Sequence, residues 1–250
     1  MRQAVPSPAV RSYAVTHPSG TVQLPTEAGW DLLLYATRGV MTVHAADDVW
    51  VVPPQRALWA PDGRWFRIEM GGRVSVRTLY FRSGLGLMAP RWRTVDVTAL
   101  VRELILETVR RCPLDLDDDP SARLVGVLVD QLAGLPDTPV RLPWPGDPQA
   151  RALAELLTSE EAAHSSLDDL ARQVGASRRT LERRFAADTG LGIAAWRRRQ
   201  RLVHALRLLA EGTPVTDVAV RVGYSTPSAF TAMFTAAMGA PPSRHASPER

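Results

Sequence analysis

The sequence predicts an α+β protein: an N-terminal β-barrel with two following helices, then a C-terminal all-α domain with two helix-turn-helix units. Two observations carry this prediction. Residues 1 to about 95 alternate short β-branched and aromatic runs with turn residues, which is typical of a small barrel or jelly roll. Between Leu167 and Met238, the pattern D-[LV]-A-x-x-V-G occurs twice, starting at Asp169 and again at Asp217.

Turn residues mark the ends of the predicted N-terminal strands. Gly39, Gly71-Gly72 and several Pro- or Asp-containing turns are expected to end runs that are rich in Val, Ile, Leu, Trp and Tyr. The strands are expected at residues 11–15, 31–36, 40–44, 49–52, 57–59, 66–70 and 74–81.

Helical periodicity replaces the strand pattern from Thr98 to Leu132. The first helix should bury one broad face, formed by Val97, Leu100, Val101, Leu104, Ile105 and Val109. Asp119 is expected to cap a second helix that has Pro120 in its first turn. That helix is apolar nearly all round, so it either packs within the domain or forms a dimer interface, and both interpretations stand.

A proline-rich stretch divides the chain. We expect a sensor or dimerisation domain at 1–135, a linker at 136–148 and a DNA-binding domain at 149–250. Within the last, the helix-turn-helix units are expected at about 167–188 and 215–238.

The repeated pattern has a physical reason. Two helices joined by a short turn cross steeply, and a small Ala171 or Ala219 lets them approach closely. Gly175 and Gly223 supply a turn that a β-carbon would hinder. The second helix of each unit can then present its N-terminal residues to a major groove.

Arginines are concentrated after the first unit begins. Ten lie between residues 172 and 207, where the acids are Glu182 and Asp188. Such a local excess suits phosphate contact, and arginine can also read guanine. The second recognition helix is uncharged on its outward side, so the first unit should dominate affinity. The expected DNA-binding residues are Ser177, Arg178, Arg179, Thr180, Glu182, Arg183, Arg184, Arg197, Arg198, Arg201, Thr226, Pro227, Ser228 and Thr231.

The remaining chemistry-bearing residues predict neither a metal nor a cofactor. The five histidines are scattered, and Cys112 is the single cysteine, so no intrachain disulfide forms and a reducing cytoplasm is expected. We expect no signal peptide and no membrane-spanning segment, because no apolar run of the sequence reaches the required length. Aromatic residues of the β region either line a ligand cavity or form plain core. They are Trp30, Tyr35, Trp50, Trp59, Trp65 and Tyr80.

These residues together resemble the AraC/XylS family of bacterial transcription regulators. The resemblance covers about the last hundred residues, and its motifs are Ser166 to Phe185, Thr189-Gly190, the helix beginning at Trp196, and Val222 to Phe230 with Phe234 and Gly239 to Ser243. It implies two helix-turn-helix units that enter adjacent major-groove segments on one face of DNA. The N-terminal part resembles the cupin sensor domain of such regulators, at residues 33–40 and 51–61, but lacks the metal-ligand histidines of enzymatic cupins. Where family members often carry basic residues after the first Phe of the second recognition helix, this chain has Thr231-Ala232-Met233.

The expected function is therefore sequence-specific regulation of transcription in the bacterial cytoplasm. The expected partners are double-stranded DNA, a small-molecule effector and a second copy of the chain, with RNA polymerase as a further candidate. Two alternatives remain: a cupin-type enzyme with an accessory DNA-binding module, and an architectural protein that has no preferred DNA sequence.

Overall fold

The computed structural model describes residues 8–23, 28–45, 48–137, 141–159 and 165–245. Contacts divide the chain into two compact units. Unit 1 contains residues 1–41 and 52–139, and unit 2 contains residues 42–51 and 140–250. The domain boundaries expected from the sequence remain a prediction.

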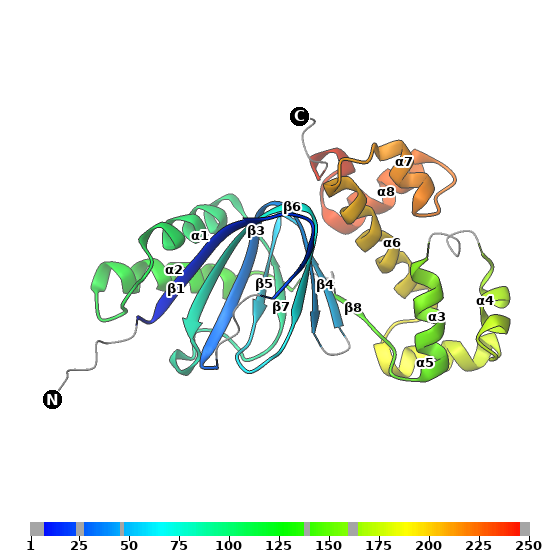
Figure 1. Ribbon diagram of the computed structural model, residues 1–250, viewed down its shortest axis with the longest axis horizontal. Coiled ribbons are helices and arrows are strands. Elements are labelled where there is room, and N and C mark those ends of the chain that lie inside the picture. Colours follow the sequence, from blue (N-terminus) through cyan, green and yellow to red (C-terminus); the bar gives the residue numbers. More distant parts are fainter. Residues whose placement is uncertain (1–7, 24–27, 46–47, 138–140, 160–164, 246–250) are drawn as a thin grey trace. The chain divides into compact units, whose positions relative to one another are not determined.

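The strands form one antiparallel sheet with the order β1-β6-β3-β4-β8, in which β2 pairs with β6, and β5 pairs with β3 and β7 (Figure 1). Its strands are β1 (Val10–His17), β2 (Gly20–Val22), β3 (Trp30–Ala45), β4 (Asp48–Val52), β5 (Arg56–Ala60), β6 (Arg67–Arg82), β7 (Arg93–Asp96) and β8 (Arg141–Pro143). The α+β fold class is confirmed.

Two glycine breaks that the sequence predicts do not end strands. Gly39 lies inside β3 with φ +79°, and Gly72 lies inside β6 with φ +73°. A β-carbon on Gly39 would lie 2.6 Å from the Arg73 carbonyl oxygen, so the close approach of these strands requires glycine. Four of the expected short strands are therefore two long ones, and each carries a positive-φ glycine partway along its length.

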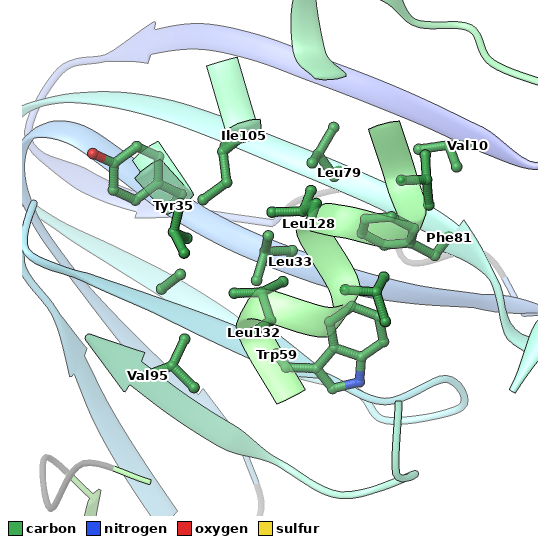
Figure 2. Close-up of a cluster of buried hydrophobic side chains, with 14 of the residues drawn as sticks. Val10, Leu33, Tyr35, Trp59, Leu79, Phe81, Val95, Ile105, Leu128 and Leu132 are labelled. Carbon is green, nitrogen blue, oxygen red and sulfur yellow. The ribbon is translucent and has the colours of Figure 1, made fainter. Parts of the chain in front are cut away.

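One face of the sheet is covered by two helices, α1 (Ala99–Arg111) and α2 (Asp119–Gly134). Figure 2 shows Leu33 and Trp59 from the strands facing Leu128 and Leu132 from the helical layer, in one buried cluster. Residues at alternate positions of the strands point to opposite faces. Since Leu32 and Leu34 are also buried, β3 is buried on both faces of the sheet.

Two details of these helices differ from the sequence predictions. The N-cap of α2 is Asp118 rather than Asp119, and its carboxylate accepts hydrogen bonds from the amide and the hydroxyl of Ser121 at 3.0 and 2.6 Å. Leu100 was expected on the buried face of α1, but 52% of it is exposed. Val127 of α2 is 46% exposed. Both helices therefore bury one face fully and leave an apolar side chain outside it.

Unit 2 contains the remaining helices. They are α3 (Pro148–Thr158), α4 (Leu167–Gln173), α5 (Arg178–Thr189), α6 (Ile193–Ala210), α7 (Val215–Arg221) and α8 (Pro227–Met238). The sequence did not predict β8, which pairs with β4. The indole of Trp196 on α6 donates a 2.6 Å hydrogen bond to the Pro143 carbonyl, so α6 fixes the end of this strand.

None of the helices that the structure describes combines the length and the apolar character that crossing a bilayer requires.

Candidate nucleic-acid interface

Each copy of the repeated pattern forms a helix-turn-helix unit. In the first, α4 buries Leu170 and Ala171 against Leu181 and Phe185 of α5. In the turn, Gly175 has φ +68°, which a residue with a β-carbon rarely adopts. The predicted role of the small alanine and the glycine is confirmed.

The second unit repeats this arrangement. Helix α7 buries Val218 and Ala219, and α8 buries Phe230 and Phe234. Gly223 has φ +81° in the turn. Helix α6 packs against α5 near its start and against α7 near its end, and it connects the two units (Figure 1).

The N-terminus of α5 is capped and its outer side is basic. The hydroxyl of Ser177 accepts a hydrogen bond from the Thr180 amide at 3.2 Å and bonds to the Thr180 hydroxyl at 2.9 Å. Arg178, Arg179 and Arg183 are exposed. Arg178 lies 3.9 Å from Glu182, whereas Arg179 and Arg183 form no ion pair among the described residues.

Arg184, which the sequence grouped with these arginines, is used inside the protein. Its guanidinium forms a 3.0 Å ion pair with the Asp147 carboxylate and donates a 2.7 Å hydrogen bond to the Gln149 side chain. The Gln149 amide in turn donates to the Gly175 carbonyl in the turn at 3.0 Å. Arg184 therefore ties α5 to the start of α3 and, through Gln149, to the helix-turn-helix turn.

Two carboxylates complete this network at the start of α3. Asp147 caps α3 by accepting hydrogen bonds from the amides of Gln149 and Ala150 at 3.1 and 3.0 Å. The bond from the Ala150 amide, followed by the ion pair with Arg184, lowers the pKa of Asp147 below its usual value. Asp188 at the other end of α5 accepts from the amides of Gly146 and Asp147 at 2.9 and 2.8 Å. No local sequence pattern predicts this network, because its members are far apart along the chain.

The arginines of α6 differ in their exposure. Arg198 is exposed, whereas Arg197 and Arg201 are partly buried. Arg197 donates to the Ser165 carbonyl at 3.4 Å, and burial together with the nearby Arg201 lowers its pKa. The guanidinium of Arg201 lies 5.4 Å from the centre of the Tyr224 ring, so it also supports the second unit.

The outer side of α8 is hollowed and carries no charge. Thr226 caps the helix, since its hydroxyl accepts a hydrogen bond from the Ala229 amide at 3.2 Å. The small side chains leave a shallow hollow there, into which a convex partner surface can fit. It is lined by Pro227, Ser228, Thr231, Ala232, Thr235 and Ala236.

Comparison with known proteins identifies this arrangement. A helix-turn-helix domain model matches residues 170–247. The HTH-type transcriptional regulator NimR of Escherichia coli K12 is 30% identical over 213 residues, which cover 85% of this chain and 78% of NimR. The chain belongs to the AraC/XylS family of transcription regulators.

Other proteins are similar to the whole chain or to part of it. The regulator RipA of Corynebacterium glutamicum is 29% identical, over 84% of this chain and 60% of RipA. The crystal structure of ToxT from Vibrio cholerae covers 95% of this chain and 96% of its own, with 12% identity and a TM-score of 0.39. The DNA-binding domain of AdpA, solved in complex with a target DNA, is 33% identical over 40% of this chain and 90% of its own, with a TM-score of 0.36.

Membership of the AraC/XylS family makes this chain a DNA-binding regulator of transcription rather than an enzyme. NimR and RipA are HTH-type transcriptional regulators, and this chain contains both of the helix-turn-helix units that its sequence predicts. The coarse function that the sequence predicts is therefore confirmed.

The aromatic residues predicted to form a ligand pocket of this AraC/XylS protein are not gathered in one place. Tyr35 and Trp59 belong to the cluster beneath α1 and α2 (Figure 2). Trp50 is buried on β4, and Tyr80 is buried on β6. Trp30 and Trp65 share one cavity. Any ligand role for the six aromatics remains a prediction.

Proposed function

We propose that the first helix-turn-helix unit reads the operator sequence and supplies most of the electrostatic attraction to DNA, while the second unit contributes close fit. The observation that carries this proposal is the contrast between the two recognition helices. Helix α5 exposes Arg178, Arg179 and Arg183, whereas α8 exposes an uncharged hollow. Arginine side chains can bond guanine bidentately, and a small uncharged surface allows backbone and van der Waals contact.

The proposed DNA-contacting residues follow from these positions. Ser177 and Thr226 start the two recognition helices, which favours contacts of the helix N-termini with phosphate. On α6, Arg198 is exposed enough for a phosphate contact. Arg184 is not proposed to contact phosphate, because its guanidinium already pairs with Asp147 and donates a hydrogen bond to Gln149.

Operator selection tests this assignment. DNA selected from random oligonucleotides by the full-length protein gives the operator, and Arg179→Ala and Arg183→Ala are then compared on operator and on random DNA. We expect each variant to lose about tenfold or more on the operator and less on random DNA. Equal losses on both would rule out base reading by these side chains.

We propose in addition that the regulator is a homodimer that responds to a small molecule in the bacterial cytoplasm. The exposed Leu100 and Val127 on neighbouring helices support a partner surface on α1 and α2. A second copy is the simplest partner, since paired half-sites match a two-fold dimer. Sedimentation should show a dimer for the wild type and a monomer for Leu100→Glu/Val127→Glu. A wild-type monomer bound to paired half-sites would contradict the dimer.

RNA polymerase is a further proposed partner.

A further inference from the structure

Unit 1 contains a cavity of about 220 Å³ beside the start of β3. We call it the Trp30–Trp65 cavity. Trp30 and Phe66 are 8% and 3% exposed, so they form fixed walls, whereas Trp65 is 65% exposed and stands at the rim. The cavity is lined by Ala28, Trp30, Leu32, Pro61, Gly63, Arg64, Trp65 and Phe66.

The cavity lies on the sheet face that α1 and α2 do not cover. Leu33 and Tyr35 of β3 point into the cluster beneath those helices. Residues 32–35 pair regularly with β5, so side chains alternate there and Leu32 points the opposite way. The cavity is therefore separate from the packed core of the domain.

The loop that forms the rim is held in place from within. The Asp31 carboxylate accepts a 2.8 Å hydrogen bond from the Asp62 amide. The Asp62 carboxylate accepts from the Gly29 amide at 2.9 Å and from the Ser83 hydroxyl at 3.0 Å. These two acids are thus committed to the loop, and burial raises the pKa of Asp31.

The cavity offers aromatic side chains and one guanidinium, that of Arg64, to a ligand. The Arg11 guanidinium lies 3.8 Å from the centre of the Trp30 ring and holds that wall in place, although Arg11 itself does not line the cavity. Arg64 lines the cavity itself, is exposed and forms no ion pair among the described residues. Tryptophan and phenylalanine side chains favour stacked or edge-on contacts with another ring, and a guanidinium favours a carboxylate.

We propose that the Trp30–Trp65 cavity binds a small planar aromatic carboxylate as the effector. The ring packs against Trp30, Trp65 and Phe66, and the carboxylate faces Arg64. The size of the cavity limits the ligand to one or two rings, because drug-sized ligands occupy about 300 Å³ or more. This inference rests on the proposed response to a small molecule and names its site and its ligand class.

Calorimetric titration of the full-length protein tests the site. The probes are benzoate and indole-3-carboxylate, each compared with its uncharged carboxamide. We expect at least one acid to bind, and its carboxamide to bind about fivefold more weakly. Arg64→Gln should weaken the acid about fivefold, and Trp65→Ala should weaken it about tenfold.

Two controls guard against a general effect of these substitutions. Arg67→Gln, at the start of β6, removes an exposed arginine that does not line the cavity and should leave binding unchanged. The exposed Trp65 contributes little to folding, so Trp65→Ala should melt at the wild-type temperature. Absence of binding by both acids would overturn the proposal, as would binding that is unaffected by Arg64→Gln and Trp65→Ala.

The regulatory role is tested separately from the site. Operator affinity measured with and without the bound acid should change, and this change should disappear in Trp65→Ala. A ligand that binds the cavity without altering operator affinity would leave the binding site established and overturn its role as effector. A change in operator affinity that persists in Trp65→Ala would place the response elsewhere and overturn this site.

Discussion

Replacing Arg184 with alanine distinguishes a structural arginine from a DNA-contacting one. Arg184 forms a 3.0 Å ion pair with Asp147 and a 2.7 Å hydrogen bond to Gln149. Arg183, one position earlier, is exposed and forms no ion pair among the described residues. The two neighbours therefore make a matched pair, in which the same substitution should have opposite consequences.

The magnitudes follow from the bonds that are lost. The hydrogen bond to Gln149 alone contributes about 1 kcal/mol to the free energy of unfolding. For a unit of about 100 residues, losing this hydrogen bond lowers the melting temperature by about 4–8 °C. A phosphate contact would instead make the dependence of log K on log salt concentration shallower by about 0.9 when it is removed.

We expect Arg184→Ala to lower the melting temperature of unit 2, which contains both helix-turn-helix units, and to leave the salt dependence of operator binding unchanged. Arg183→Ala should leave melting unchanged and weaken operator binding. Thermal denaturation followed by circular dichroism, and DNA binding at several salt concentrations, measure both quantities. If Arg184→Ala melted like the wild type and its salt slope became shallower by about 0.9, the internal role of Arg184 would be refuted.

Three further substitutions test the fold. Trp196→Phe keeps an aromatic side chain but loses the indole N–H, and with it the 2.6 Å hydrogen bond to the Pro143 carbonyl, so it should cost about 1–3 kcal/mol or more in urea denaturation; a cost near zero would contradict a stabilising bond. Gly39→Ala adds a β-carbon 2.6 Å from the Arg73 carbonyl at φ +79° and should cost about 2–4 kcal/mol, whereas wild-type stability would show that the strands can separate there. The hydrogen bonds to Asp118, chiefly those from the side chain and amide three residues on, lower its pKa below the usual 3.8, so its capping stabilises unit 1 above that pH and is lost as pH falls through the lowered pKa. Urea midpoints of wild type and Asp118→Ala should therefore differ at pH 7 and converge once the pH falls below the lowered pKa of Asp118; a constant difference would exclude the charged cap.

The sequence predicted the elements whose signals are local. The repeated pattern specified both helix-turn-helix units, because each needs a small residue, a turn glycine and two buried apolar positions at fixed spacing. Ser177 and Thr226 directly precede the second helices of these units, and the hydroxyl of each accepts a backbone hydrogen bond as an N-cap. Helix caps can be read from sequence because the bonding groups lie within one turn of each other.

The glycines of the sheet were predicted less well. A glycine within an apolar run usually ends a strand or allows a bulge, and these outcomes have the same sequence signal. The partner strand decides between them. Gly39 continues β3 because β6 runs so close to it that a side chain would not fit.

The sequence by itself determined the fold class, the two DNA-binding units and the excess of arginine around the first of them. Tertiary structure alone decided which arginines are available, since Arg184 is engaged by Asp147 and Gln149, which lie more than thirty residues away along the chain. It also decided which tryptophans line a common cavity: Trp30 and Trp65 do, whereas Trp59 belongs to the core. The physical reason is that capping and periodicity act within a few residues, whereas ion pairs and cavities join groups that only the folded chain brings together.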